Sequence, residues 1–170
     1  EIARILDRYA ASGVCNIMAL RGDPPRGTSS FPHVPGGFRR AAELVAFIRE
    51  RHPTMGIGVA GYPEGHPETP NRLEELQHLR EKVDAGADYI CTQLFFDNHD
   101  FTDFQMRCAL AGIHVPIIAG IMPITSLRQI RRMSAMALGM HIPGKLLRAL
   151  LRAQGGESLE KVGIHWATEQ

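Results

Sequence analysis

Apolar residues along this chain recur at two alternating periods, that of an amphipathic helix and that of a buried strand. A helical stripe covers residues 2–11 and ends at Gly13, and a continuous apolar run follows at 14–20. A second helical stripe starts at Ala41, and the next apolar run is 55–63. The pattern therefore predicts helix, strand, helix and strand, in that order.

The alternation continues through the next eighty residues. Asn71 stands at the N-cap position of a helix that Gly86 closes, and the apolar run 88–96 follows. A helix at 101–111, a strand at 115–123 and a helix from 127 to about 137, with Ser126 as its N-cap, come next. The tail predicts helices within 141–154 and 157–170. Strands that alternate with helices and are apolar on both faces are typical of βαβ units in a parallel sheet.

Two α/β architectures share this order of elements, the (β/α)8 TIM barrel and the open, doubly wound sheet. No G-x-G-x-x-G or G-x-x-x-x-G-K motif follows any predicted strand, which favours the barrel. A barrel needs eight strands and typically about 250 residues. We therefore predict that residues 1–170 form a partial catalytic barrel domain with about four of the eight βα units and exposed sheet edges, and that the chain is a piece of a longer polypeptide.

Composition narrows the choice of partners. The formal charge is +1, from 19 basic and 18 acidic residues, which gives no sign of a nucleic-acid or membrane-surface binder. No apolar run approaches the roughly 18 residues of a membrane span. Cys15, Cys91 and Cys108 lack metal-site spacing, and we expect buried, reduced thiols in a cytoplasmic protein.

Polar residues collect where the predicted strands end. Arg21-Gly22-Asp23 follows the first strand, residues 62–68 follow the second, and Gln93 lies near the end of the third. The carboxyl ends of parallel strands form one rim, where ligands bind. Gln93 needs either a ligand or an internal hydrogen-bond partner, and Arg21 with Asp23 forms either a simple ion pair or part of a site.

Other interpretations of these residues are weaker. The Arg-Gly-Asp tripeptide matches a cell-adhesion motif, but its apolar lead-in makes a chance match the better explanation. Glu64, His66 and Glu68 alternate as metal ligands can, yet prolines interrupt them, and we predict no metal site. A Schiff-base aldolase would place a lysine on a strand, and none of the four predicted strands contains one.

Four motifs, in this order and spacing, resemble the methylenetetrahydrofolate reductase family: NIMALRGDPP (16–25), VAGYPEGHPE (59–68), LREKVDAGADYICTQLFFDN (79–98) and PIIAGIMPI (116–124). The resemblance covers nearly residues 1–143. It implies a (β/α)8 barrel that binds FAD, takes a hydride from NADH or NADPH, and reduces 5,10-methylenetetrahydrofolate to 5-methyltetrahydrofolate in one-carbon and methionine metabolism.

The resemblance also assigns roles to residues. It implies a cofactor site lined by Arg21, Gly22, Asp23, Ala41, Tyr62, His66, Thr69, Glu75, His78, Glu81 and Lys82. It implies folate contacts for Asp23, Gln93 and Gln129. Asp23 would face both the flavin and the folate, which makes it the catalytic candidate, and Lys82 would supply a cation for the diphosphate.

The family's general-acid glutamate lies on the first barrel strand, which is not among the four predicted here. The second, third and last strands, the last with a folate-binding arginine, are likewise expected outside this sequence. We therefore expect the 170 residues alone not to catalyse the reduction. A catalytically silent fragment or isoform that only binds FAD or assembles with a partner remains an alternative. The choice between NADH and NADPH and the formation of a homo-oligomer also stay open.

Overall fold

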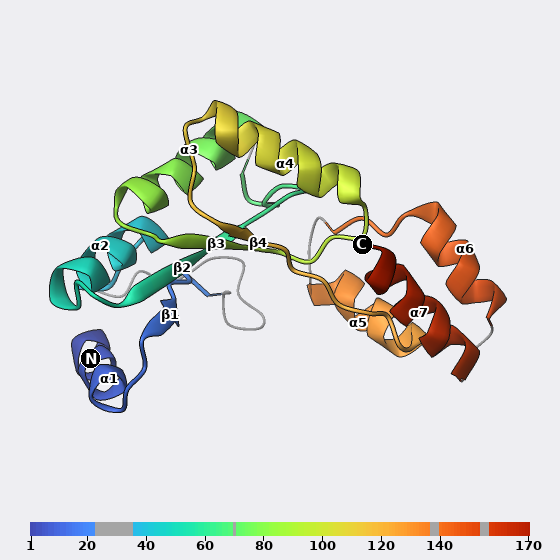
Figure 1. Ribbon diagram of the computed structural model, residues 1–170, viewed down its shortest axis with the longest axis horizontal. Helices are drawn as coiled ribbons and strands as arrows, with labels where there is room; N and C mark the ends of the chain where they lie inside the picture. Colours follow the sequence, from blue (N-terminus) through green and yellow to red (C-terminus); the bar gives the residue numbers. More distant parts are fainter. Residues whose placement is uncertain (23–35, 70, 137–139, 154–156) are drawn as a thin grey trace.

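The computed structural model describes residues 1–22, 36–69, 71–136, 140–153 and 157–170. Helices and strands alternate through most of this part of the chain, as predicted (Figure 1). In order, the elements are α1 (Ile2–Ala11), β1 (Asn16–Met18), α2 (Ala41–Arg51), β2 (Gly56–Gly61), α3 (Arg72–Asp84), β3 (Tyr89–Thr92), α4 (Asn98–Leu110), β4 (Ile117–Ile118), α5 (Leu127–Met136), α6 (Gly144–Arg152) and α7 (Glu157–Glu169).

The four strands form one parallel sheet in the order β1-β2-β3-β4, so each strand pairs with its neighbour in sequence. Asn16 pairs with Gly56, Gly58 with Tyr89, and Ile90 with Ile117. Consecutive parallel strands joined by helices are the repeating unit of a TIM barrel, and the sheet is consistent with part of one.

The main core lies between the sheet and helices α2, α3 and α4, which cover one of its faces (Figure 1). Ile57, Val59 and Ile90 point from the strands into this core, where Val45 and Phe104 meet them from the helices. Strand residues alternate between two faces, so Gly58 and its pairing partner Tyr89 lie on the opposite face, with Met18. Met18 is 37% exposed there, which leaves that face of the sheet largely uncovered.

The C-terminal helices α5, α6 and α7 build a second core, with Phe96 and Ile124 as their link to the strand ends. They gather beyond one end of the sheet, away from α2 (Figure 1). Two side chains from the C-terminal end hold the segment after β3: Trp166 Nε1 of α7 donates to the Phe96 carbonyl at 3.1 Å, and Nε2 of Gln170, just after α7, donates to the Phe95 carbonyl at 3.1 Å. Because β3 ends at Thr92, the Phe95 and Phe96 carbonyls have no partner in the sheet, and these bonds satisfy them.

The strands are shorter than predicted. The run 88–96 pairs only at 89–92, and the run 115–123 pairs only at 117–118. The segment after Thr92 turns into α4 instead, because Asp97 caps that helix by accepting the His99 N–H, so the helix begins at Asn98. Asn71 caps α3 as predicted, accepting the N–H groups of Leu73 and Glu74 at 3.0 Å.

The cysteines only partly follow their prediction. Cys108 is buried within the main core, Cys91 is half-buried, and Cys15 is exposed. Cys15 was expected inside a buried strand, but it precedes β1, which lies at an edge of the described sheet and has no strand on its outer side. Burial raises the pKa of the Cys108 thiol to about 11, which keeps it protonated.

Candidate functional site

A cavity of about 560 Å³ opens at the carboxyl ends of β1, β2 and β3, where the sequence places its polar residues. Its walls come from the segment after β1, the start of α2, the segment between β2 and α3, and one side of α3. Ten of the predicted site residues line it: Arg21, Gly22, Ala41, Tyr62, His66, Thr69, Glu75, His78, Lys82 and Gln93.

Lys82 is a half-buried cation that lines this cavity. Its Nζ donates to the Ala60 carbonyl at 2.6 Å, across the end of the sheet. The previous ladder bond of β2 on this side runs from the Ala19 N–H to the Gly58 carbonyl. Strand β1 ends at Met18, so the ladder does not extend to the next carbonyl of β2, and Lys82 supplies the donor.

Burial lowers the pKa of Lys82 to about 8, and the nearby Glu75 carboxylate partly opposes this shift. Among the described residues, no carboxylate forms an ion pair with Lys82. The hydrogen-bond acceptor of its Nζ is a neutral carbonyl. A lysine ammonium has three donors, and one carbonyl uses one of them. Lys82 can therefore donate to a further acceptor within the cavity.

Glu75 presents an acceptor that the fold leaves unused. The residue is only 9% exposed, its Oε2 accepts from Arg72 at 3.2 Å, and its Oε1 is buried without a hydrogen-bond partner. A buried carboxylate oxygen without a donor is costly. A ligand hydroxyl or amino group at this wall would satisfy it.

An aromatic pair lies at the end of β2. The rings of Tyr62 and His66 meet edge to face with centroids 4.7 Å apart. His66 Nδ1 accepts the backbone N–H of Glu68 at 3.1 Å, so the neutral ring carries its proton on Nε2. The pKa of His66 is lowered mainly by burial, which favours this neutral form.

Arg21 and Glu68 form an ion pair at the cavity mouth, with 2.7 Å between Nη2 and Oε2. The pair links the end of β1 to the segment after β2, and both side chains remain more than a third exposed. Gly22 follows with φ +82°, a left-handed conformation that side chains rarely adopt. Asp23, the predicted catalytic residue, lies outside the described residues.

The apolar residues around Gln93 suggest a position within the third strand, but Gln93 lies just outside it. Strand β3 ends one residue earlier, so Gln93 is exposed at the cavity, and its Oε1 accepts the Leu94 N–H at 2.8 Å. This local bond uses the side-chain oxygen of Gln93 and not its NH₂ group. Thr92, just before it, is buried and accepts the Gly120 N–H at 2.8 Å.

Two predicted residues do not line the cavity. Glu81 of α3 pairs with Arg40, just before α2, at 3.2 Å. Gln129 is held by the turn before α5: its Oε1 accepts the Thr125 N–H at 2.8 Å, and its Nε2 donates to the Pro123 carbonyl at 3.1 Å.

The structure also adds residues that sequence reasoning missed. Arg107 of α4 lines the cavity, and its Nη2 donates to the Pro63 carbonyl at 3.0 Å. The sequence offered one signal for Arg107: it lies one residue before Cys108, which was predicted to be buried. Arg40 and Glu68 also line the cavity, and Glu68 was considered only as a metal ligand.

Neither a metal cluster nor a membrane-spanning helix is found in the part of the chain that the structure describes. No three His, Cys, Asp or Glu side chains there are grouped to hold a metal ion. None of the helices in these ranges has the length and apolar content to cross a bilayer.

The sequence of this chain is similar to those of several named proteins. A methylenetetrahydrofolate reductase of Arabidopsis thaliana, named as NADH-dependent, is 42% identical over 99% of this chain. Methylenetetrahydrofolate reductase 2 of Saccharomyces cerevisiae is 48% identical over 71% of it. The chain spans 30% of the plant protein and 21% of the yeast protein.

A solved structure shares the fold. It is an uncharacterised protein from Clostridium thermocellum, described as binding two copies of 5-methyl-5,6,7,8-tetrahydrofolic acid. It covers 75% of this chain with a TM-score of 0.57 and 19% identity, and the match spans 44% of that protein. At this identity the likeness supports the α/β architecture.

The family model for methylenetetrahydrofolate reductase matches residues 1–170. That match agrees with the plant and yeast relatives and with the motifs at the strand ends. The chain therefore belongs to the methylenetetrahydrofolate reductase family.

Proposed function

We propose that this chain forms the flavin-binding and folate-binding wall of a methylenetetrahydrofolate reductase barrel. The complete barrel would reduce 5,10-methylenetetrahydrofolate to 5-methyltetrahydrofolate with NADH or NADPH. The observation that carries this proposal is Lys82, a half-buried ammonium that bonds a single carbonyl inside a large cavity. Withdrawing such a cation from water is costly, and an anionic ligand would offset that cost.

FAD fits the chemistry of this cavity. Its diphosphate would lie at Lys82, with Arg21 at the mouth as a second cation. The unpaired Glu75 Oε1 would accept from a ribose hydroxyl or the adenine amino group, with His78 and Thr69 on the same wall. Ala41 begins α2 and lines the cavity, and the N-cap residue makes no side-chain cap, so the N–H groups of this first turn would be available to the cofactor.

The redox end of the cofactor would lie toward the strand ends. Bound there, the flavin would accept a hydride from the nicotinamide and pass it to the folate. Tyr62 and His66 would pack against the flavin ring, and the neutral His66 could donate from Nε2. Gln93 would offer its NH₂ group to the folate, and Asp23 and Gln129 are proposed to complete that contact.

Turnover is expected to require more of the barrel. In this family a glutamate is thought to act as general acid, and strands β1 to β4 carry no glutamate. We propose that residues 1–170 are part of one catalytic domain and are inactive by themselves. A fragment that only binds FAD or assembles with a partner is the second candidate, and the two open edges of the described sheet favour it.

The test is the visible absorption of the purified chain after incubation with FAD and removal of free cofactor. We expect oxidised flavin to stay with the protein, and Lys82→Ala to weaken retention at least tenfold. Asp23→Asn tests the redox end, and Lys145→Ala on exposed α6 is the matched control. Retention that Lys82→Ala leaves unchanged would contradict the site, and turnover by the isolated chain would contradict its inactivity.

A further inference from the structure

Residues 63–69, here called the wall segment, lie between β2 and α3 and carry the His66 imidazole to the cavity. This segment has no regular secondary structure, so its shape depends on contacts with its surroundings. These contacts come from four different parts of the chain.

Two arginines hold the beginning of the wall segment. Arg107 of α4 donates to the Pro63 carbonyl at 3.0 Å, and Arg72 of α3 donates to the Glu64 carbonyl. Gly65 follows with φ +97°, and the Arg72 guanidinium occupies the place that a side chain at this position would take. The backbone is therefore bent around an arginine.

The far end of the wall segment is tied to β1 by the Arg21–Glu68 pair at 2.7 Å. Because both partners are more than a third exposed, this tie contributes little by itself.

The fourth tie comes from the C-terminal helices. Both carboxylate oxygens of Glu64 accept the backbone N–H of His141, at 3.0 and 3.1 Å. His141 lies in the connection between α5 and α6, and Ile142 beside it packs into the second core. Glu64 is half-buried, so this charge-assisted bond is poorly screened by solvent.

We propose that Glu64 is a positioning residue, which couples the C-terminal helices to the cavity by fixing the wall segment and, through it, the His66 ring. The backbone between Glu64 and His66 is a single glycine, so a shift of Glu64 is passed to His66 within two residues. This inference rests on the proposed function only where its test measures flavin affinity.

The primary test follows His66 itself, by NMR titration of its ring in the complete 170-residue chain, with the signal assigned by His66→Gln. Burial keeps the pKa of His66 low, and Arg21, Glu68, Glu75 and Lys82 are the charged groups around it. If Glu64→Ala frees the wall segment, His66 gains solvent, and its pKa rises toward the ordinary value.

Three further variants distinguish a positioning role of Glu64 from a general destabilisation of the chain. Glu64→Gln keeps an acceptor for the His141 N–H and should leave the pKa of His66 near that of the parent chain. His141→Pro removes the N–H from the other side and should reproduce Glu64→Ala. Glu50→Ala, on the exposed face of α2, is the matched control.

Flavin affinity is the second readout, expected to fall roughly fivefold to tenfold in Glu64→Ala and to be restored in Glu64→Gln. The inference is overturned if Glu64→Ala and His141→Pro both keep a native circular dichroism spectrum and an unchanged pKa of His66. If the pKa of His66 moves as expected while the parent chain binds no flavin, the proposed function fails and the positioning role stands.

Discussion

At the scale of single residues, the cavity combines costly groups that a ligand would satisfy. Lys82 is half-buried on a neutral carbonyl, and Glu75 keeps a buried oxygen without a donor. The resemblance to the family led to both residues, and Lys82 lies within the motif at 79–98. Their burial could not be predicted, since it depends on where β1 ends and how α3 packs against β2.

Lys82→Met should stabilise the ligand-free chain while weakening flavin retention. The pKa of Lys82 is about 8 in the folded chain and about 10.5 when unfolded, so the charged form costs stability below pH 8. Between these values the unfolded state binds more protons, and stability rises with pH. Urea denaturation at pH 7 should show a gain of about 1–2 kcal/mol, allowing for the donor lost by Ala60, and the gain should shrink toward pH 10.

Flavin affinity should fall as the pH rises above about 8. The diphosphate favours the charged ammonium of Lys82, so binding takes up a proton wherever free Lys82 is partly neutral. Fluorescence titration with FAD between pH 6.5 and 10 measures the affinity. A profile as steep in Lys82→Met as in the parent chain would assign the effect to another group.

At the scale of elements, the pattern of apolar positions identified the order of helices and strands correctly, and the ends of the strands were less accurate. Leu73 shows the limit for helices. Its apolar side chain and helical spacing with Leu76 favour an inward position on α3, yet it is 80% exposed, and Glu75 is buried instead. The strand predictions ran too long because an apolar run does not reveal where the chain leaves the ladder: Phe95 and Phe96 are buried by α4 and α7 rather than by pairing.

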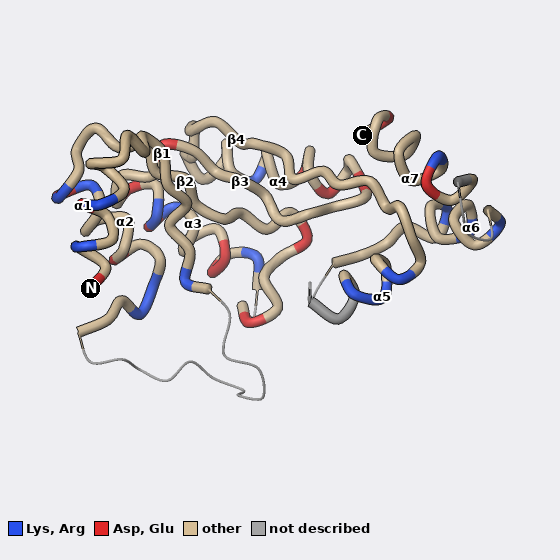
Figure 2. The backbone as a smooth tube through the Cα atoms, turned by 90° about the horizontal axis from the view of Figure 1, so that it is seen from below, with Lys and Arg blue, Asp and Glu red and all other residues tan. Residues whose placement is uncertain are grey.

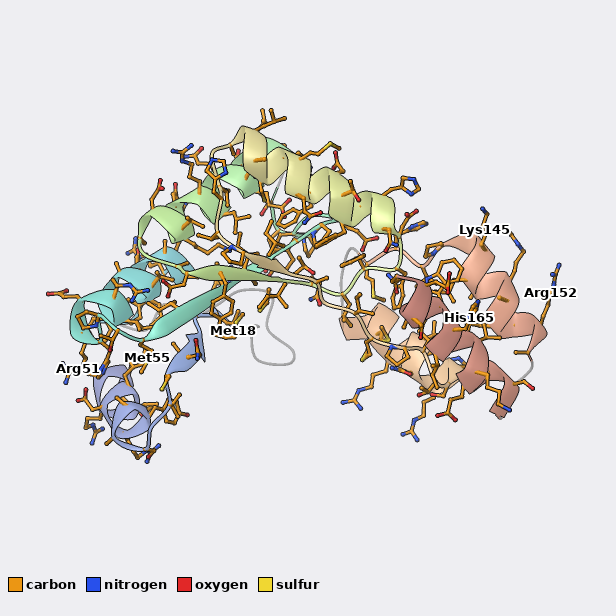
Figure 3. The ribbon with its side chains drawn as sticks, viewed as in Figure 1. Met18, Arg51, Met55, Lys145, Arg152 and His165 are labelled. Atoms are coloured by element: carbon orange, nitrogen blue, oxygen red, sulfur yellow. The ribbon has the colours of Figure 1, made fainter. Side chains whose placement is uncertain are left out.

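The amino ends of β2 and β3 are joined by Arg49, and Arg49→Met should destabilise the chain. Its guanidinium donates to the Gly86 and Met55 carbonyls at 2.8 and 3.0 Å and pairs with Asp88 at 2.6 Å. Loss of these partly buried bonds should lower the free energy of unfolding by about 2–3 kcal/mol in urea denaturation. Arg152→Met, on the outer side of α6, is the control (Figure 3). Equal effects of both variants would exclude this role.

Trp166 reports on how α7 contacts the strand ends. It is the only tryptophan in the sequence, and its indole N–H donates to the Phe96 carbonyl. Trp166→Phe should lower the free energy of unfolding by about 1 kcal/mol, because it removes that bond while retaining an aromatic ring.

The fluorescence of Trp166 also tests whether α7 unfolds with the rest of the chain. In the parent chain, the tryptophan emission should shift to the red in a single transition as urea is added. An earlier shift than the loss of far-UV circular dichroism would show that α7 detaches first.

At the scale of the whole molecule, a four-stranded sheet has helices on one face and few neighbours on the other (Figure 1). The backbone tube, turned by 90°, shows the C-terminal helices extending beyond the sheet (Figure 2). The four-stranded parallel sheet followed from counting strands in the sequence. The second core could not be foreseen, because amphipathic tails do not reveal which strand ends they cover.

Exposed apolar residues on the uncovered face should promote self-association. Ile118 is 52% exposed on β4, and Leu20 is 50% exposed just beyond β1. Ile118→Lys should raise the concentration at which light scattering first increases, without changing the circular dichroism spectrum. Leu110→Lys on α4, which changes an even more exposed residue away from that face, is the control. An equal gain from both variants would indicate a general charge effect.

The two free edges of the described sheet belong to β1 and β4, its first and last strands. A polypeptide that completes the barrel must therefore pair with both edges at once, whereas one that adds to a single edge lengthens an open sheet. This makes the chain suitable as one half of a split reporter: a second fragment that protects both edge strands from hydrogen exchange has paired with both edges at once.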